Sequence, residues 1–295
     1  MAQTMKEIKR RISSVGNIMQ ITNAMELVST AKLRKTRAKL ELTRPYFQTV
    51  YENINDILAV SNEKSSVFLD ERPVKTRAVI VCASDRGLAG GYNINVCKEA
   101  LKFKSEGNGV KTIFYATGVK AYDLLKRRGC DVNLDYSIIG DEPEMEDAME
   151  IGKFLLDKYS ASEIDEVFVV YTRFKSVLSL IPDTIKILPA TGFEATEIDE
   201  GETDPNNGKK VPIEYEPSAE AVLDQMIRQY VNVSIYGCLL EASTSEQASR
   251  RTAMESATDN GKDLLSDLEL KYNRARQANI TQEISEIVGG AEALK

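Results

Sequence analysis

The sequence predicts an α/β fold plus long helices, in which an α/β domain is inserted between N- and C-terminal helices that pair as an antiparallel coiled coil. Three observations predict it: a long helical pattern at each end of the chain, and an alternation of short apolar runs with helical patterns between them. We expect residues 1–60 to be the N-terminal coiled-coil helix, 74–216 the α/β domain and 217–295 the C-terminal coiled-coil helix.

The C-terminal helix is predicted by Ser218 to Val288, a stretch with no proline and only two glycines. At 1.5 Å per residue it would be about 105 Å long. Its apolar and small residues recur at spacings of three and four, which is typical of a narrow coiled-coil seam. The seam comprises Leu223, Met226, Tyr230, Val233, Gly237 and Leu240, and it resumes at Leu265, Leu268, Tyr272 and Ala275. Gly289 and Gly290 are expected to end the helix.

The N-terminal helix shows the same spacing in two registers. They are Met5, Ile8, Ile12, Val15, Met19 and Thr22, and then Leu33, Thr36, Leu40, Thr43, Phe47, Val50, Ile54 and Ile57. Pro45 lies inside the second register, where we expect a kink or a short break. Pairing the terminal helices with each other buries both seams. The alternative is two separate helices on the α/β domain, but a domain of about 150 residues, with a radius of gyration of about 15 Å, is too small to cover such a rod.

The predicted C-terminal helix is longer than its N-terminal partner, which supplies only about 85 Å of pairing surface. Roughly the last 15 to 20 residues should therefore extend beyond the pair. In that stretch an apolar stripe continues through Ile280, Ile284, Ile287, Ala291 and Leu294. An exposed apolar stripe of this size usually marks a partner, and a frayed tail is the alternative.

Charge is distributed unevenly along the chain. The net charge is -7, but residues 1–44 hold ten basic and three acidic residues, so they carry +7 and the remainder -14. The run from Lys32 to Lys39 places five positive charges on about two helical turns without an acid. An acidic protein partner or a nucleic acid could use such a patch. Because the remainder is acidic and no aromatic residue interleaves with these basic residues, we expect no nucleic-acid binding.

The middle of the chain alternates strand and helix patterns, which predicts one domain with a mostly parallel sheet flanked by helices. The expected strands are 77–83, 111–116, 167–171 and 184–188, and the expected helices are 95–104, 119–127 and 145–159. Residues 193–216 are expected to form a polar loop or an exposed hairpin.

The sequence offers little catalytic chemistry. The segment SDRGLAGGYN, Ser84 to Asn93, follows the first expected strand, where a Rossmann-like domain holds a phosphate. Its glycines match neither the dinucleotide fingerprint nor the P-loop, so we expect no directly bound nucleotide and no cofactor. The chain has no histidine, and its four cysteines lack C-x-x-C spacing, so we predict no catalytic or metal site and expect reduced, buried thiols. Neither a signal peptide nor an apolar run of about 18 residues is present.

Three separated segments resemble the gamma subunit of bacterial rotary (F-type) ATP synthase. They are Arg10 to Lys35, Ser84 to Asn93 and Glu241 to Leu294, so the resemblance runs through the whole chain in order. It implies a central rotor shaft that couples ion-driven rotation of the membrane c-ring to ATP synthesis and hydrolysis at the alpha/beta ring, with no catalytic residues of its own. The implied partners are three alpha and three beta subunits, the epsilon subunit and the c-ring. The implied location is the cytoplasmic face of the bacterial cell membrane, as a peripheral protein.

The resemblance also implies which residues meet the alpha/beta ring. They are Met25, Lys32, Arg34, Lys35, Arg250, Gln277 and Thr281. An apolar tip formed by Ile280, Ile284 and Ile287 would be seated in an apolar sleeve at the top of the ring. The alternatives are a coiled-coil scaffold or nucleic-acid binder that assembles alone, and a small-molecule-binding Rossmann-like protein.

Overall fold

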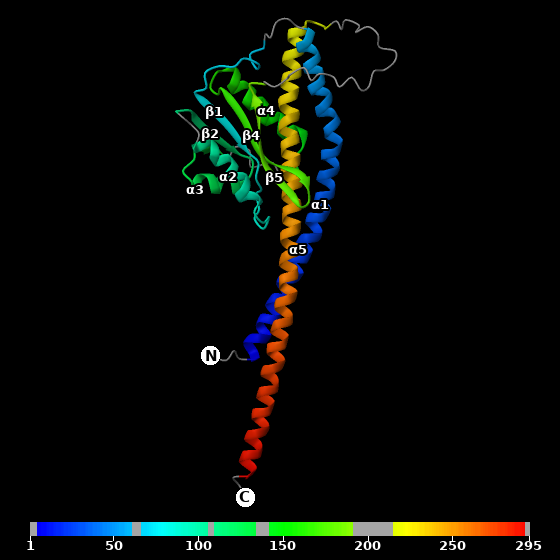
Figure 1. Ribbon diagram of the computed structural model, residues 1–295, viewed down its shortest axis with the longest axis vertical. Helices are drawn as coiled ribbons and strands as arrows, with labels where there is room; N and C mark the ends of the chain where they lie inside the picture. The colour runs from blue at the N-terminus through cyan, green and yellow to red at the C-terminus, as the bar shows by residue number, and fades with distance from the viewer. Residues whose placement is uncertain (1–4, 61–65, 106–108, 134–141, 191–214, 293–295) are drawn as a thin grey trace, which may run out of the picture. The chain divides into compact units, whose positions relative to one another are not determined.

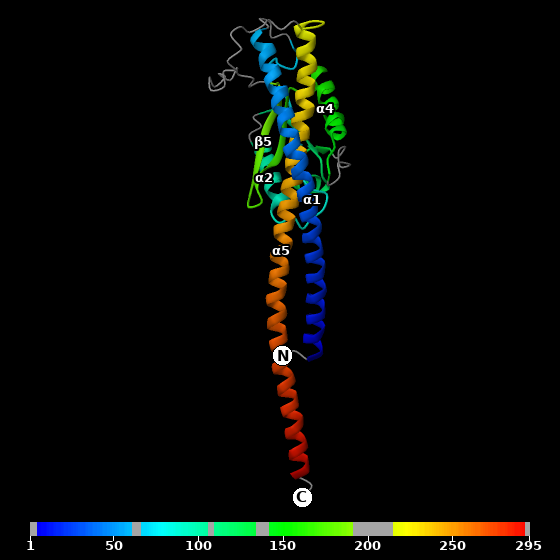
Figure 2. The same cartoon turned by 90° about the vertical axis from the view of Figure 1, so that its right-hand side faces the viewer.

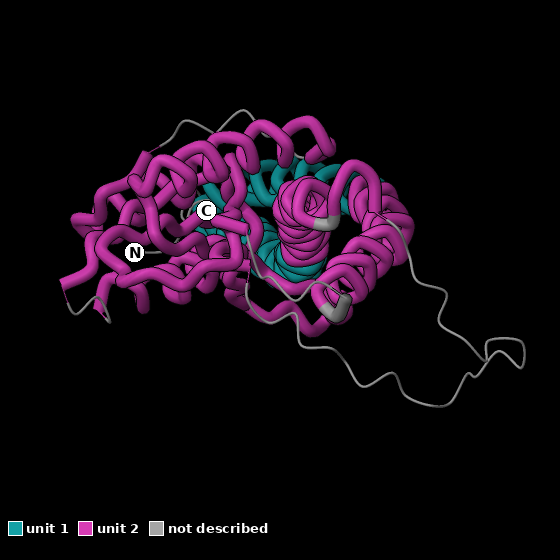
Figure 3. The backbone as a smooth tube through the Cα atoms, turned by 90° about the horizontal axis from the view of Figure 1, so that it is seen from above, with its two compact units in different colours: residues 1–31, 250–295 teal, residues 32–249 magenta. Residues whose placement is uncertain are grey.

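The computed structural model describes residues 5–60, 66–105, 109–133, 142–190 and 215–292. The elements follow in the order α1, β1, α2, β2, α3, β3, α4, β4, β5 and α5 (Figure 1). The chain divides into two compact units, a smaller one of residues 1–31 and 250–295 and a larger one of residues 32–249 (Figure 3). Helices α1 (Met5–Val60) and α5 (Ala219–Glu292) contribute to both units.

The larger unit contains a five-stranded sheet with the strand order β3-β2-β1-β4-β5. The parallel strands are β1 (Thr76–Val81), β2 (Lys111–Ala116), β3 (Val132–Asn133) and β4 (Glu166–Ser176). The edge strand β5 (Ser179–Leu188) pairs antiparallel with β4. The predicted mostly parallel sheet is therefore confirmed.

Strands β4 and β5 are longer than the sequence predicted. Their outer halves form a hairpin that carries polar side chains, among them Arg173 on β4, which forms an ion pair with Asp183 on β5. Because the prediction relied on apolar runs, it found only the more apolar halves of these strands. The outer halves alternate polar residues with Phe174 and Leu180, which pack into a smaller cluster with side chains of α1 and α5.

Helices cover both faces of the sheet. On one face α2 (Tyr92–Ser105) and α3 (Val119–Arg127) pack against β1 side chains such as Val79. On the other face α4 (Met145–Ser160) packs with the parts of α1 and α5 that belong to this unit, against side chains such as Ile80. Successive β1 residues thus fill two apolar clusters, as the period of two along a strand requires.

Helix α5 is buried more broadly in the larger unit than a coiled-coil seam would be. The predicted seam residues Leu223, Tyr230, Val233 and Leu240 are buried, but so are Ile227, Val231, Ile235 and Leu239. The additional residues belong to the cluster in which α5 contacts α1, α4 and the sheet together. The predicted narrow seam is therefore a wide apolar face in this unit.

The predicted short break at Pro45 and the predicted end of the C-terminal helix at Gly289 and Gly290 do not occur. Helix α1 runs from Met5 to Val60 with Pro45 inside it, and the residues around this proline are held by burial of Leu40 and Val50. Helix α5 continues through Gly289 and Gly290 to Glu292. Glycine costs a helix about 1 kcal/mol but does not remove a backbone hydrogen bond, so it need not end one. The predicted loop at 193–216, except its last two residues, lies outside the described residues.

Candidate functional site on the paired terminal helices

In the smaller unit α1 and α5 run antiparallel, side by side (Figure 2). The hydroxyl oxygens of Thr22 and Thr258 are 2.8 Å apart and share a hydrogen bond across the pair. A β-carbon placed on Gly261 would come within 2.5 Å of Cγ of Met19, so the glycine permits a closer approach of the helices than another residue would. These contacts fix the register of the pair, and the predicted antiparallel coiled coil of terminal helices is confirmed.

The pair ends where α1 begins. The Asn279 side chain donates a hydrogen bond to Sδ of Met5 at 3.2 Å, and α5 then continues beyond the start of α1 (Figure 2). Every residue from Gln277 to Ala291 is exposed. The exposed fractions of the large apolar side chains here are 47 % for Ile280, 56 % for Ile284, 71 % for Ile287 and 56 % for Val288. The predicted overhang is therefore present, and the described part of its apolar stripe is uncovered within this unit, while the predicted stripe residue Leu294 lies outside the described residues.

Three basic residues of the Lys32 to Lys39 run have carboxylate partners within the larger unit, and one of them, Arg37, pairs with Glu41 on α1 at 2.9 Å. Lys35 donates a hydrogen bond to Glu142, and Lys39 donates one to Glu144 at 2.6 Å. The hydrogen bond from Lys35 lowers the pKa of the Glu142 carboxyl. Arg34, by contrast, is exposed and has no hydrogen-bond or ion-pair partner in the part of the chain that the structure describes. The basic run is thus partly neutralised by the acidic segment that precedes and begins α4.

The other residues expected to meet a ring differ in exposure. Met25 and Lys32 are half-buried on α1, and Arg250 on α5 is only 7 % exposed. Gln277 and Thr281 are exposed one helical turn apart, and the Thr281 hydroxyl donates to the carbonyl oxygen of Gln277 at 2.9 Å. Gln277 and Thr281 therefore lie together at the base of the apolar overhang, while Lys32 belongs to the larger unit.

Hydroxyl residues of α5 attach this helix to the α/β domain, which the sequence analysis missed. The Ser245 hydroxyl donates to the carbonyl oxygen of Thr172 at 2.9 Å, and the Ser249 hydroxyl donates to that of Ala89 at 2.7 Å. A spacing of four residues places both hydroxyls on one helix face. This spacing, in residues that are weak helix formers, was the signal that could have revealed the contact.

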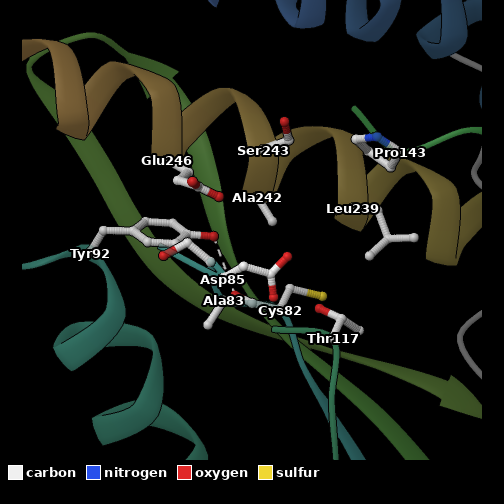
Figure 4. A pocket seen from close by; sticks show the side chains of 11 residues that line it. Cys82, Ala83, Asp85, Tyr92, Thr117, Pro143, Leu239, Ala242, Ser243 and Glu246 are labelled. Atoms are coloured by element: carbon white, nitrogen blue, oxygen red, sulfur yellow. Dashed lines mark hydrogen bonds between the residues drawn. The ribbon is translucent and has the colours of Figure 1, made fainter. Parts of the chain in front are cut away.

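The glycine-rich segment lines a narrow crevice at the carboxyl end of β1 (Figure 4). Because β1 lies between β2 and β4, this is the point at which open α/β sheets commonly bind ligands. Its volume is about 30 Å³, whereas ligand pockets usually measure about 300–1,000 Å³. A β-carbon on Gly118 would lie 2.2 Å from the carbonyl oxygen of Ala83, so the backbone segments that carry these two residues approach closely beside the crevice.

Two carboxylates further disfavour a phosphate in this crevice. Asp85 and Glu246 both line it, Glu246 from α5 (Figure 4). The Asp85 carboxylate accepts a hydrogen bond from the backbone N–H of Val119 at 3.0 Å. It therefore occupies, at the start of α3, the kind of position that a bound anion takes at a helix N-terminus.

Three of the four thiols are buried, as the sequence predicted, and Cys130 differs. All four cysteines are free, Cys82, Cys97 and Cys238 are buried, and Cys130 is half-buried. Burial raises the pKa of Cys82 and of Cys97 to about 12, so both remain protonated near neutral pH. Within the described ranges we find no cluster of acidic and cysteine side chains suited to a metal ion. Likewise, no helix in those ranges is both long and apolar enough to cross a membrane.

Comparisons by sequence and by structure point to the same family. Residues 4–294 match the family model described as ATP synthase. The ATP synthase gamma chain of Alkaliphilus metalliredigens is 47% identical over 291 residues, which cover 99% of each chain. A chain of the Euglena gracilis mitochondrial ATP synthase, in a structure of OSCP, F1 and c-ring, has a TM-score of 0.63 at 17% identity, covering 98% of this chain and 94% of that one. A chain from the central stalk and c-ring of the Tetrahymena thermophila enzyme has a TM-score of 0.54 at 23% identity, covering 80% and 99%. At such identities the two structures show a shared fold.

Proposed function

The chain belongs to the ATP synthase gamma-chain family, and from this membership we infer that it is the central rotor shaft of an F-type ATP synthase. It couples rotation driven by ion flow to ATP synthesis and hydrolysis, and it is a non-catalytic subunit of that enzyme. The complex is associated with a membrane. We further propose that this chain is a peripheral component at the cytoplasmic face of a bacterial cell membrane.

The observation that carries the function is a helix pair that ends in an uncovered apolar overhang. Two helices joined by buried side chains such as Ile8, Met254 and Leu268 resist twisting and bending better than a single helix does. The two helices also present different side chains to their surroundings, so the cross-section of the pair is asymmetric. Such a shaft gives each of three otherwise equivalent catalytic sites a different set of contacts. Turning the shaft then changes their nucleotide affinities in sequence, which is coupling by differential binding to conformational states.

We propose that the overhang is seated in an apolar sleeve of the ring. Hydrophobic contact is non-directional, so Ile280, Ile284 and Ile287 could turn against an apolar wall without passing through a series of broken hydrogen bonds. The exposed Gln277 and Thr281, at the base of the overhang, would supply a small number of polar contacts to the ring.

Lys32, Arg34 and Lys35 form a basic track on α1. We propose that this track, together with Met25 nearby on the same helix, faces acidic loops of the beta subunits. Lys35 would exchange Glu142 for a carboxylate of the ring. Because exposed ion pairs contribute about 0–1 kcal/mol, such an exchange costs little. Arg250, which is 7 % exposed, is proposed to contact the ring only through the small part of the residue that remains accessible.

The full partner set that we propose is three alpha and three beta subunits around the helix pair, with the epsilon subunit and the membrane c-ring at the α/β domain. Native mass spectrometry of the complex that carries a tagged copy of this chain tests the set. We expect one copy of the chain with three alpha and three beta chains. A free monomer, or an oligomer of this chain alone, would contradict the shaft and favour a self-assembling scaffold.

A further inference from the structure

The larger unit contains a second cavity, between α1, the β4–β5 hairpin and α5. Its volume is about 280 Å³, much larger than the 30 Å³ crevice at β1. An apolar protein cavity of about 150 Å³ is large enough to bind benzene. The second cavity therefore has room for a molecule with one or two rings.

Gly237 on α5 borders this cavity and helps to keep it open. A β-carbon placed on Gly237 would meet no heavy atom within 4 Å, so no close packing contact requires a glycine here. Gly152 differs, because a β-carbon there would lie 2.0 Å from Oδ1 of Asn232. Glycine inside a helix costs roughly 0.5–1 kcal/mol relative to alanine. At position 237 the lack of a side chain leaves the volume beside the helix open.

The walls of the cavity are largely apolar. They include Leu40 and Phe47 from α1, Ile185 from β5 and Cys238 from α5. Leu40 is 4% exposed and Cys238 is 5% exposed, so these walls are held by the surrounding core. Walls of this kind favour an apolar ligand body over a hydrated one.

The charged groups of the lining are not equally available to a ligand. Arg173 is already paired with Asp183. The Glu241 carboxylate accepts a hydrogen bond from the backbone N–H of Phe174 at 3.2 Å, and burial raises the pKa of this carboxyl. Arg44 is exposed, and no hydrogen bond or ion pair joins it to any residue that the structure describes. The charge of Arg44 interacts with the Glu241 carboxylate and acts to lower its pKa, but no hydrogen bond or ion pair in the described part of the chain occupies the Arg44 guanidinium at the edge of this cavity.

We propose that this cavity binds a small amphipathic anion, an aryl carboxylate or sulfonate whose one- or two-ring body lies beside Gly237 and whose acidic group pairs with Arg44. The planar guanidinium matches the oxygens of such a group and can bind two of them at once. The site lies wholly within the larger unit, and it does not depend on the proposed rotor function.

Isothermal titration calorimetry on the full chain tests the site, with naphthalene-2-sulfonate as the anionic probe and naphthalene-2-sulfonamide as its neutral counterpart. Gly237→Leu fills the cavity and should weaken binding of both probes by about tenfold or more, while Gly237→Ala should have a smaller effect. Arg44→Gln should weaken binding of the sulfonate about tenfold or more, the loss expected for one charge-assisted contact, and leave the sulfonamide within about twofold. Arg37→Gln, on the same helix but outside the lining, is the matched control and should change neither affinity.

Three results would overturn the proposal. They are no sulfonate binding to the parent chain at millimolar concentration, unchanged binding to Gly237→Leu, and equal losses of both probes in Arg44→Gln. Circular dichroism melting identifies any variant that fails to fold. If Gly237→Leu is such a variant, the comparison of the two probes on Arg44→Gln still decides the question.

Discussion

Replacing the three isoleucines of the overhang by glutamine tests whether the end of α5 is seated in a ring. Ile280, Ile284 and Ile287 are 47, 56 and 71 % exposed, so more than half of their combined surface remains for a partner to cover. Burying one isoleucine side chain completely contributes roughly 1.5–3 kcal/mol. Scaled by these exposed fractions, seating all three would contribute roughly 3–5 kcal/mol to assembly. Glutamine has a comparable length and favours a helix, so the overhang should stay helical.

The assay is assembly of the variant with its partner subunits, followed by ATP-driven ion pumping. A loss of roughly 3–5 kcal/mol corresponds to a dissociation constant raised at least about hundredfold. Thermal unfolding of the variant chain alone should change little. Met149→Gln, at a half-exposed residue of α4, is the control and should assemble normally. Truncation after Gln277 should act like the triple substitution. Unchanged affinity together with fully coupled pumping in the triple variant would show that the overhang is not seated in the ring.

Three further predictions concern the chain alone. Leu268→Ala should lower the free energy of unfolding by about 2–5 kcal/mol because Leu268 is buried. Leu270→Ala, at a 52 % exposed residue, should lower it by less than about 1 kcal/mol. Denaturant titration measures both losses, and equal losses would contradict a buried seam at Leu268. Lys35→Gln should cost less than about 1 kcal/mol at neutral pH. Its partner Glu142 has a lowered pKa, so this contribution is present above the unfolded-state pKa and is lost as the pH falls through the folded-state pKa. The free energies of unfolding of the parent and the variant, measured against pH, should therefore converge below the usual range of glutamate titration. A difference that stays constant there would contradict the ion pair's contribution. The buried Cys82 thiol, with its pKa of about 12, should react with a disulfide reagent only after unfolding, and rapid reaction in the folded chain, followed by absorbance, would count against its burial.

The long helices and the overhang could be predicted because their signal is local. Seam residues such as Leu268 recur along one helix, and the difference in length between the two helices is a property of the sequence. The wide burial of α5 could not be predicted in the same way. Ile235 becomes buried because α5 meets α1, α4 and the sheet together, and a periodic pattern does not say how many neighbours a helix has. The continuity of α1 through Pro45 likewise depends on tertiary packing that outweighs a local preference.

The candidate contact residues were predicted from the family resemblance, and the structure shows how far each of them is exposed. Exposed residues such as Thr281 are available to a partner, whereas Arg250 is buried in the chain. The pairing of Lys35 with Glu142 joins residues 107 positions apart, and only the folded chain brings them together. A run of basic residues therefore predicts a charged surface, but it does not show which of its charges are already paired.

Whether the helix pair rotates inside the ring can be observed in a single complex. The ring would be fixed to a surface, and a bead would be attached through a cysteine introduced at Met149, a half-exposed residue on α4. With ATP present, we expect the bead to turn in one direction and to pause three times in each revolution. A complex that hydrolyses ATP while the bead stays still would contradict rotation of the helix pair.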